Sequence, residues 1–222
     1  MSDKAHILAR TRQEVQRRFA DIDDLAHGWE HIERVYRLAE YIARQEGADI
    51  FIVGMAALLH DLGRAMPQHE KQHGRGEHHA DLSVKLAGQF LRHYRLAAET
   101  CEAIEHAILA HSFSRGVDPR TLEAKVVRDA DRLDGLGAIG ILRWAQTGTV
   151  RRTPHTHSYH PSDPFGQQRE LDDTTYMLDH FYTKLLKLGE TMQTASGREL
   201  ARRRTDFLRA YLAEFRRELL LE

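Results

Sequence analysis

The chain has 222 residues and a formal net charge of −1, so it lacks the basic surplus that favours nucleic acid as a partner. Its single cysteine, Cys101, excludes a disulfide framework and a cysteine-rich zinc site, and it suits a reducing, cytoplasmic location. No apolar run approaches the roughly 20 residues of a membrane span, so we expect no membrane partner. The unusual feature of the composition is the content of 15 histidines.

The N-terminal part of the chain predicts three helices. Residues 1–19 form a charged amphipathic helix without the apolar core of a signal peptide. A second helix stops at Gly47, and apolar residues at helical spacing mark its buried face: Ile32, Val35, Leu38, Ala39 and Ile42. Asp49 is the expected cap of a third, apolar helix, which runs to about Leu62 and is ended by Gly63.

The rest of the chain also predicts helices, now separated by loops rich in proline, glycine and polar residues. In chain order we expect a loop over 64–78, helices around 82–91 and 104–109, one long helix over 123–145 that tolerates its glycines, a loop over 148–170, and helices over 171–189 and 196–222. No segment shows the alternation of a strand.

The pattern therefore predicts one all-α domain, a helical bundle over residues 1–222. Its expected parts are a core at about 25–147, a lid-like loop at 148–170 and C-terminal helices at 171–222. The "RRR" at 202–204 alternates with acidic residues, which indicates a solvated helix face rather than a nucleic-acid site. For the oligomeric state, the sequence is compatible with a monomer and with a homodimer.

A histidine and an aspartate, His60 and Asp61, end the apolar run "AALL". An unpaired charge in such a setting is costly, and a divalent cation satisfies a carboxylate and an imidazole together. Adjacent helix residues point about 100° apart, so ligands from other helices must converge. His31 and Asp131 are the expected suppliers; His27 lies four residues before His31 on the same helix face.

The order of His31, then His60 with Asp61, then Asp131 resembles the signature of the HD superfamily of metal-dependent phosphohydrolases. In that family an apolar helix follows the first histidine, as in "HIERVYRLA" here, and this resemblance selects His31 rather than His27 as the ligand. The phrases "AHSFS" and "EAKVVRDADRLDGLGAIGILR" resemble the YedJ-type branch of small bacterial HD-domain proteins.

The resemblance implies an HD-domain helical bundle with additional C-terminal helices and a metal at its centre. It also implies hydrolysis of a phosphate ester or anhydride, commonly in a nucleotide, as by a nucleotide phosphatase or pyrophosphohydrolase. Two imidazoles and two carboxylates suit one divalent ion (Mn, Fe, Co, Ni, Mg or Zn), which would supply the attacking water. The alternative is a catalytically silent, metal-stabilised module for nucleotide binding or signalling.

Three cations are candidates for contact with a small phosphate substrate. Arg64 follows the His60–Asp61 pair by three residues. His180 and Lys184 lie one helical turn apart and fall within the span of the resemblance. Phosphoryl transfer needs such cations around the phosphate oxygens.

Further histidines leave open whether the site holds one metal ion or two. A second ion could take ligands from His78 or His79 and from His111, but we expect a single ion. Glu77 and His79 could instead form the acid–base pair that positions the attacking water, which would make His79 and Glu77 catalytic beside Asp61.

Two more groups of polar residues are not expected to bind the metal or the substrate directly. Asp129 and Asp134 are expected to orient ligands or to pair with Arg132. The histidines of the "TPHTHSYHP" segment could bind metal only adventitiously: His155, His157 and His160.

Overall fold

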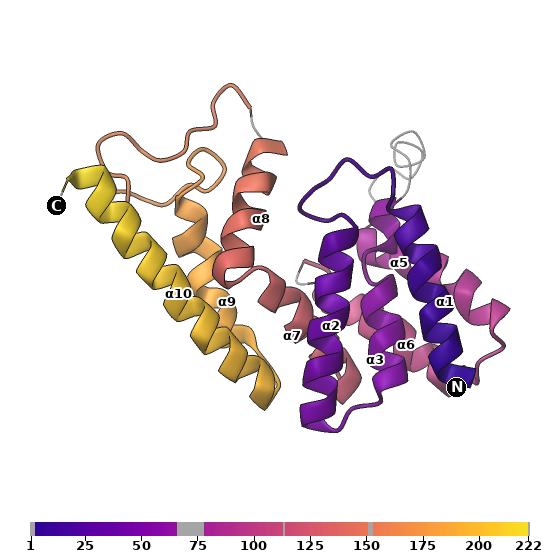
Figure 1. Cartoon of the computed structure of the whole chain (residues 1–222). Helices are drawn as coiled ribbons and strands as arrows, with labels where there is room; N and C mark the ends of the chain where they lie inside the picture. Colours follow the sequence, from indigo (N-terminus) through magenta and orange to yellow (C-terminus); the bar gives the residue numbers. More distant parts are fainter. Residues whose placement is uncertain (1–2, 66–77, 113, 151–152, 222) are drawn as a thin grey trace. The chain divides into compact units, whose positions relative to one another are not determined.

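The computed structural model describes residues 3–65, 78–112, 114–150 and 153–221 (Figure 1). Within these residues the structure is helical, with one isolated bridge between His157 and Tyr176 and no strand, so the predicted all-α fold is confirmed. None of the described helices combines the length and hydrophobicity that a bilayer span requires. The chain forms two compact units, one of residues 1–131 with 193–197 and one of residues 132–192 with 198–222.

The first unit is built around α3 (Ile50–Leu59), whose side chains are apolar and buried on every face except at its start. Asp49 caps α3 as expected, since its carboxylate accepts hydrogen bonds from the amides of Phe51 and Ile52. Around α3 lie α1 (Asp3–Arg18), α2 (Trp29–Glu46) and α6 (Ala98–His111), and α6 in turn packs on α5 (His79–His93) (Figure 1).

The end of α3 differs from the prediction. The helix stops at Leu59, three residues early, and a 3-10 turn, η1 (Leu62–Ala65), follows. Gly63 lies inside this turn and is needed for packing: a Cβ there would lie 2.6 Å from the carbonyl oxygen of His79. Gly47, by contrast, does end a helix: it is the C-cap of α2 and takes a left-handed φ of 76°.

The expected long helix over 123–145 is two helices, which corrects that prediction. They are α7 (Leu122–Asp134) and α8 (Gly137–Val150). Gly137 takes a left-handed φ of 70°, which a helix interior does not allow. A Cβ on Gly140 would lie 2.3 Å from the carbonyl oxygen of Gly135, so the turn requires glycine there too.

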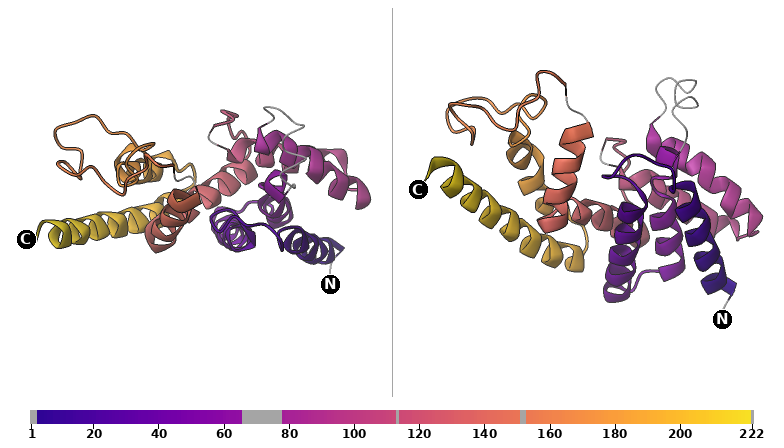
Figure 2. Two further views of the ribbon diagram at one scale, coloured as in Figure 1. Left: turned by 90° about the horizontal axis from the view of Figure 1, so that it is seen from above. Right: turned by 45° about the horizontal axis from the view of Figure 1, so that its top comes forward.

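The second unit packs α8 and a long irregular segment on α10 (Ala195–Leu220), which Figure 2 shows as one extended helix. The ring of Phe181 is fully buried, stacks on Tyr211 at 5.9 Å and meets Trp144 edge-on at 4.9 Å. These aromatic contacts form much of the core of this unit.

The helix expected over 171–189 is also shorter than predicted. It begins only with a π-helical turn, η2 (Phe181–Leu185), followed by α9 (Leu186–Leu188) and η3 (Gly189–Thr191). Before it, the Asp172 carboxylate accepts hydrogen bonds from the amides of Thr174 and Thr175. Such side-chain bonds stabilise a turn at the expense of a helix.

Residues 193–197 return to the first unit, where they meet α7. The buried carboxylate of Asp129 accepts hydrogen bonds from the amide of Gln193 and from the amide and hydroxyl of Thr194. A Cβ on Gly197 would lie 2.4 Å from this carboxylate, so glycine is required for the approach. The C-terminal chain thereby holds the helix that carries Asp131.

Candidate metal centre

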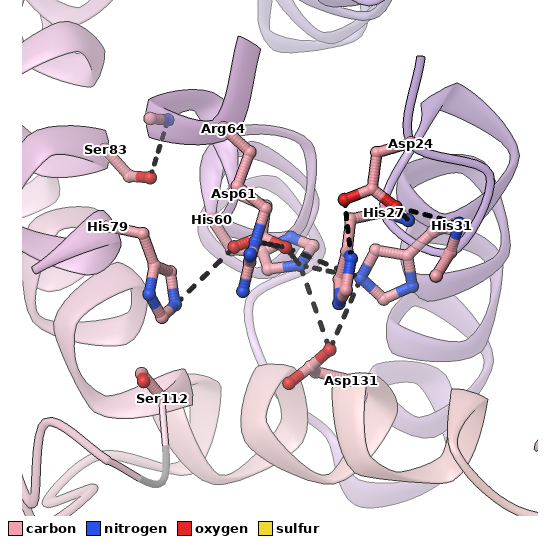
Figure 3. Close-up of polar contacts among 12 residues, drawn as sticks. Asp24, His27, His31, His60, Asp61, Arg64, His79, Ser83, Ser112 and Asp131 are labelled. Atoms are coloured by element: carbon pink, nitrogen blue, oxygen red, sulfur yellow. Dashed lines mark hydrogen bonds and ion pairs between the residues drawn. The ribbon is translucent and has the colours of Figure 1, made fainter. Parts of the chain in front are cut away.

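Three separate segments of the first unit bring His31, His60, Asp61 and Asp131 together (Figure 3). His31 lies in the first turn of α2, His60 ends α3, Asp61 follows it, and Asp131 lies on α7. His31, His60 and Asp61 are buried.

The first ligand group is formed by His31, His60 and one oxygen of Asp61, with Asp131 beside it. Their candidate ligand atoms lie within 4.8 Å of one another for the first three residues. The Nε2 atoms of His31 and His60 are 3.3 Å apart, and Nε2 of His31 lies 3.5 Å from Oδ1 of Asp131. Oδ2 of Asp61 lies 3.8 Å from both imidazoles.

A second ligand group uses the other oxygen of Asp61 together with His79 and His111. Oδ1 of Asp61 lies 3.7 Å from Nε2 of His79 and 3.8 Å from Nε2 of His111. This buried oxygen makes no hydrogen bond. Asp61 therefore presents one carboxylate oxygen to each group of histidines.

Two of these rings are held by backbone carbonyls through their other nitrogen. Nδ1 of His60 lies 2.8 Å from the oxygen of Ala57, and Nδ1 of His111 bonds to the oxygen of Ile108. Because a carbonyl only accepts, the hydrogen of each ring is assigned to Nδ1, and Nε2 presents its lone pair to the cluster. This arrangement is the usual one for histidines that bind metals.

The protonation states also suit metal binding. Burial lowers the pKa of His79 to about 4 and lowers the pKa of His111. Burial by itself would raise the pKa of Asp61, but Arg64 and the surrounding histidines hold it well below its usual range. The pKa of Asp131 is lowered in the same way, by histidines that outweigh its burial. Neutral imidazoles and ionised carboxylates are the forms that ligate metals.

The cluster fits a divalent ion better than it fits a set of direct contacts. The separations of 3.5–3.9 Å between nitrogens and carboxylate oxygens are too long for good hydrogen bonds. Ligands about 2.1 Å from a shared ion are themselves about 3.0 to 3.5 Å apart. An all-nitrogen and oxygen donor set without thiolate suits Mn, Fe, Co, Ni or Zn.

Arg64 lies at the cluster, but its contact is with a candidate ligand. Its Nε donates a hydrogen bond of 2.7 Å to Oδ2 of Asp61. A charge-assisted bond of this kind fixes the carboxylate and favours its ionised form.

The adjacent histidines at the start of α5 have different positions, which the sequence left open. His78 caps the helix, since its Nδ1 accepts a hydrogen bond from the amide of Ala80, and its Nε2 lies 2.8 Å from Oγ of Ser114. His79 instead turns toward Asp61 (Figure 3). Glu77 lies outside the described residues.

The remaining candidates make other contacts. Asp129 bonds to Gln193 and Thr194, and Asp134 pairs with Arg143 at 3.3 Å. In the second unit, His180 directly precedes the π-helical turn η2 and its Nδ1 lies 2.8 Å from Oδ2 of Asp173, and Lys184 lies on η2. Arg132 donates a hydrogen bond of 2.9 Å to the carbonyl of Thr191, and its pairing with Asp129 or Asp134 stays a prediction.

The histidines at 155–160 form no metal-binding group within the described part of the chain. Nδ1 of His160 accepts a hydrogen bond from the amide of Asp163, and the ring of His157 lies against Tyr176. These contacts stabilise turns in the irregular segment.

Sequence reasoning assigned no role to Asp24, although its spacing from His27 was a usable signal. Nδ1 of His27 lies 2.9 Å from Oδ2 of Asp24, and the ring of His27 meets that of His31 edge-on (Figure 3). An acid three residues before a histidine is well placed for such a pair.

Comparison with known proteins agrees with the cluster. The family model for the HD domain matches residues 28–136, a span that contains all six candidate metal ligands. The Bacillus subtilis protein YpgQ is 32% identical over 198 residues, which cover 87% of this chain and 84% of YpgQ. The chain therefore belongs to the HD domain superfamily.

Solved structures show the same fold over nearly the whole chain. The crystal structure of YpgQ in complex with ADP has a TM-score of 0.71 and 32% identity, over 95% of this chain and 97% of that one. An HD-superfamily hydrolase from Bacillus thuringiensis has a TM-score of 0.74 and 28% identity, over 99% and 100% of the two chains.

Proposed function

We propose that this protein is a metal-dependent phosphohydrolase that cleaves a phosphate ester or anhydride bond in a nucleotide. The observation that carries the proposal is Asp61, a buried carboxylate with one oxygen in each of two histidine groups. Arg64 binds Oδ2 of Asp61, but the buried Oδ1 makes no hydrogen bond and so lacks the partner that a buried carboxylate oxygen requires.

The first group, His31, His60, Asp61 and Asp131, would hold one divalent ion. The sequence favoured a single ion, but the grouping of Asp61 with His79 and His111 supports a second position, and we propose that both are used. When bound there, a divalent ion lowers the pKa of a coordinated water and polarises a phosphoryl oxygen.

The side chains of this protein have complementary tasks. Arg64 holds Asp61 ionised through a bond of 2.7 Å and brings a guanidinium to the cluster, where it can meet phosphate oxygens. We keep His180 and Lys184 as candidates for substrate contact, and Glu77 with His79 as the alternative water-positioning pair. Membership of the YedJ-type branch stays a prediction.

A nucleotide is the favoured substrate because YpgQ, which is similar over most of its length, was crystallised in complex with ADP. Nucleoside di- and triphosphates carry the anhydride bonds and the dense negative charge that a metal and an arginine can bind together. A catalytically silent nucleotide-binding module would bind ADP equally well, so binding alone does not test the proposal.

The test is turnover by metal-defined protein. Purified protein is stripped with a chelator, reloaded with Mn²⁺, and assayed with ADP, ATP and deoxynucleoside triphosphates. Phosphate and pyrophosphate are measured separately, because the product distinguishes a phosphatase from a pyrophosphohydrolase. We expect turnover that depends on added metal and that is lost in His31→Ala.

The matched control is His93→Asn, which removes an exposed imidazole at the end of α5 and is expected to keep full turnover. Binding of ADP without hydrolysis of any nucleotide would contradict the proposal and favour the silent module.

A further inference from the structure

Residues 193–197, which we call the C-terminal clip, hold α7 through Asp129. The carboxylate of Asp129 accepts hydrogen bonds from the amide of Gln193 at 3.0 Å and from the amide and the hydroxyl of Thr194 at 2.8 and 2.7 Å. Hydrogen bonds to a carboxylate are stronger than those between neutral groups. The clip therefore binds α7 firmly, although 64 and 65 residues of chain separate the partners.

The clip also bonds to α2, the helix that carries His31. Oε1 of Glu46, the last residue of α2, accepts a hydrogen bond of 2.6 Å from the amide of Ser196. Since α7 carries Asp131, the clip connects two helices that each supply a candidate ligand of the first group. The clip and both helices up to Asp131 belong to the first unit.

The contact between the clip and α7 is buried and leaves little freedom. Asp129 is fully buried and Thr194 is 3% exposed. The hydroxyl of Thr194 donates to Asp129 and accepts a hydrogen bond of 3.0 Å from the amide of Gly197. A Cβ on Gly197 would lie 2.4 Å from Oδ2 of Asp129, so the backbone there approaches as closely as glycine allows. A connected, buried network of this kind fixes one arrangement of its members.

Asp129 and Asp131 lie on opposite faces of α7, because residues two apart in an α-helix point about 200° apart. Asp131 is directed at the histidines of the first group, with Oδ1 3.5 Å from Nε2 of His31 and 3.9 Å from Nε2 of His60 (Figure 3). α7 is therefore held between the cluster on one face and the clip on the other.

Asp131 depends on its helix more than its neighbours in the cluster do. Its side chain is 26% exposed, whereas those of His60 and Asp61 are 0% and 4% exposed. The ring of His60 is held by the carbonyl of Ala57, and the carboxylate of Asp61 is held by Arg64. Among the described residues no hydrogen bond holds the carboxylate of Asp131. The position of α7 therefore decides where this carboxylate lies.

We propose that the clip positions Asp131 for metal binding, and that Thr194 and Asp129 are the positioning residues. The inference rests on the metal centre of the proposed function. Groups that orient a metal ligand typically contribute about 10- to 100-fold to metal affinity without touching the ion. Thr194 and Asp129 act in this way through Asp131.

The decisive variant is Thr194→Val, which removes the hydroxyl and keeps the branched shape. The amide of residue 194 can still bond to Asp129, so the clip is weakened rather than lost. We expect the affinity for Mn²⁺ to fall by about 10-fold or more when chelator-stripped protein is titrated by calorimetry. Thr194→Ser, which keeps the hydroxyl, should retain the wild-type affinity.

The matched control is Thr11→Val in α1. Thr11 is buried in the first unit, as Thr194 is, but its hydroxyl makes no hydrogen bond. The same chemical change at this position should leave the affinity for Mn²⁺ at the wild-type value.

A double-mutant cycle with Asp131→Asn separates positioning of the ligand from a general structural role. If Thr194 acts through Asp131, Thr194→Val weakens Mn²⁺ binding in the wild-type background but causes no further loss in Asp131→Asn. A general loosening of the first unit would instead weaken binding by the same factor in both backgrounds, and that result would overturn the inference.

A wild-type affinity for Mn²⁺ in folded Thr194→Val would also overturn it. Should far-UV circular dichroism show that Thr194→Val does not fold, Asp129→Asn decides by the same titration. This variant keeps one acceptor oxygen and turns the other into a donor, so it should weaken Mn²⁺ binding, and unchanged affinity would overturn the inference.

The outcomes also separate this inference from the proposed function. Mn²⁺ binding by wild type without turnover of any nucleotide would overturn the proposed function but not this inference, whose measure is affinity. Absence of Mn²⁺ binding by wild type would overturn both.

Discussion

Asp61 in the first unit and Asp179 in the second are both buried aspartates, but their carboxylates are satisfied in opposite ways. Both oxygens of Asp179 accept hydrogen bonds from Arg169, at 2.6 Å each, and one also accepts from the amide of Asp172 at 2.7 Å. Asp61 has one arginine bond, at 2.7 Å, and one oxygen without any hydrogen bond among histidines.

The difference separates a structural acid from a functional one. The pair of Arg169 and Asp179 is closed: the guanidinium is matched in geometry, it also stacks over Tyr176 at 4.8 Å, and no further partner is needed. Asp61 is open, since its second oxygen is buried and lacks the partner that such an oxygen requires. We propose that a metal ion supplies that partner.

The largest expected effect is on activity, in Asp61→Ala. Removing an outer partner of a metal ligand already costs about 10- to 100-fold, so loss of the shared carboxylate is expected to lower turnover on the order of 10³-fold or more. Metal content should fall with it, while far-UV circular dichroism stays helical. Metal analysis and turnover are measured on the same preparation; a variant with bound metal and full turnover would exclude Asp61 as a ligand.

Asp179→Ala should instead affect stability. Removing one partner of a buried ion pair typically costs about 3 to 5 kcal/mol, because Arg169 keeps its charge in a site built for a carboxylate. Urea unfolding measures the loss, and the folded fraction should bind metal as wild type does. The matched control is Asp173→Ala. Asp173 pairs with His180, and because both side chains of this pair are more exposed, the expected loss of stability is below about 1 kcal/mol. Equal losses in the two variants would contradict the comparison.

The second ligand group is tested by His79→Ala and His111→Ala. Each removes an imidazole from the Oδ1 side of Asp61, so each should reduce the metal content from two ions per chain to one. Mass spectrometry under native conditions gives the stoichiometry. One ion in wild type, unchanged in both variants, would restore the single-ion mechanism and leave His79 with a water-positioning role.

A smaller effect is expected from pH in the metal-free protein. His79 stays neutral in the folded state down to about pH 4, whereas its ordinary pKa is 6.5. Between these values the unfolded chain binds more protons, so stability is lost as pH falls from about 6.5 to 4. His79→Gln should flatten this dependence by up to about 1 kcal/mol per pH unit.

Urea unfolding at pH 7 and pH 5, with chelator present, measures the difference between wild type and variant. An identical pH dependence in the two proteins would show that burial does not exclude protons from His79 in the folded state.

The fold was predictable where apolar spacing decides it. The stripe on α2, its end at Gly47 and the Asp49 cap of α3 all follow from local sequence. The break between α7 and α8 did not, because a glycine that takes a left-handed φ is indistinguishable in sequence from one tolerated inside a helix. The turn at Asp172 was not predicted, because the spacing of the apolar residues there also fits a helix.

The site was predictable in its residue types but not in all of its geometry. The order of His31, His60, Asp61 and Asp131 selects residues that the structure brings together, and their role as ligands stays a prediction. The choice between His78 and His79 depends on which ring caps α5, and spacing cannot decide between neighbours.

The return of residues 193–197 to the first unit has a consequence for synthesis on the ribosome. The bonds from Gln193 and Thr194 to Asp129 cannot form until some 60 further residues have been translated. At about 5 to 20 residues per second this takes several seconds, during which the helix that bears Asp131 lacks its last hydrogen bonds. We therefore expect the proposed metal site to reach its tightest affinity only as α10 begins to emerge, late in the synthesis of the chain.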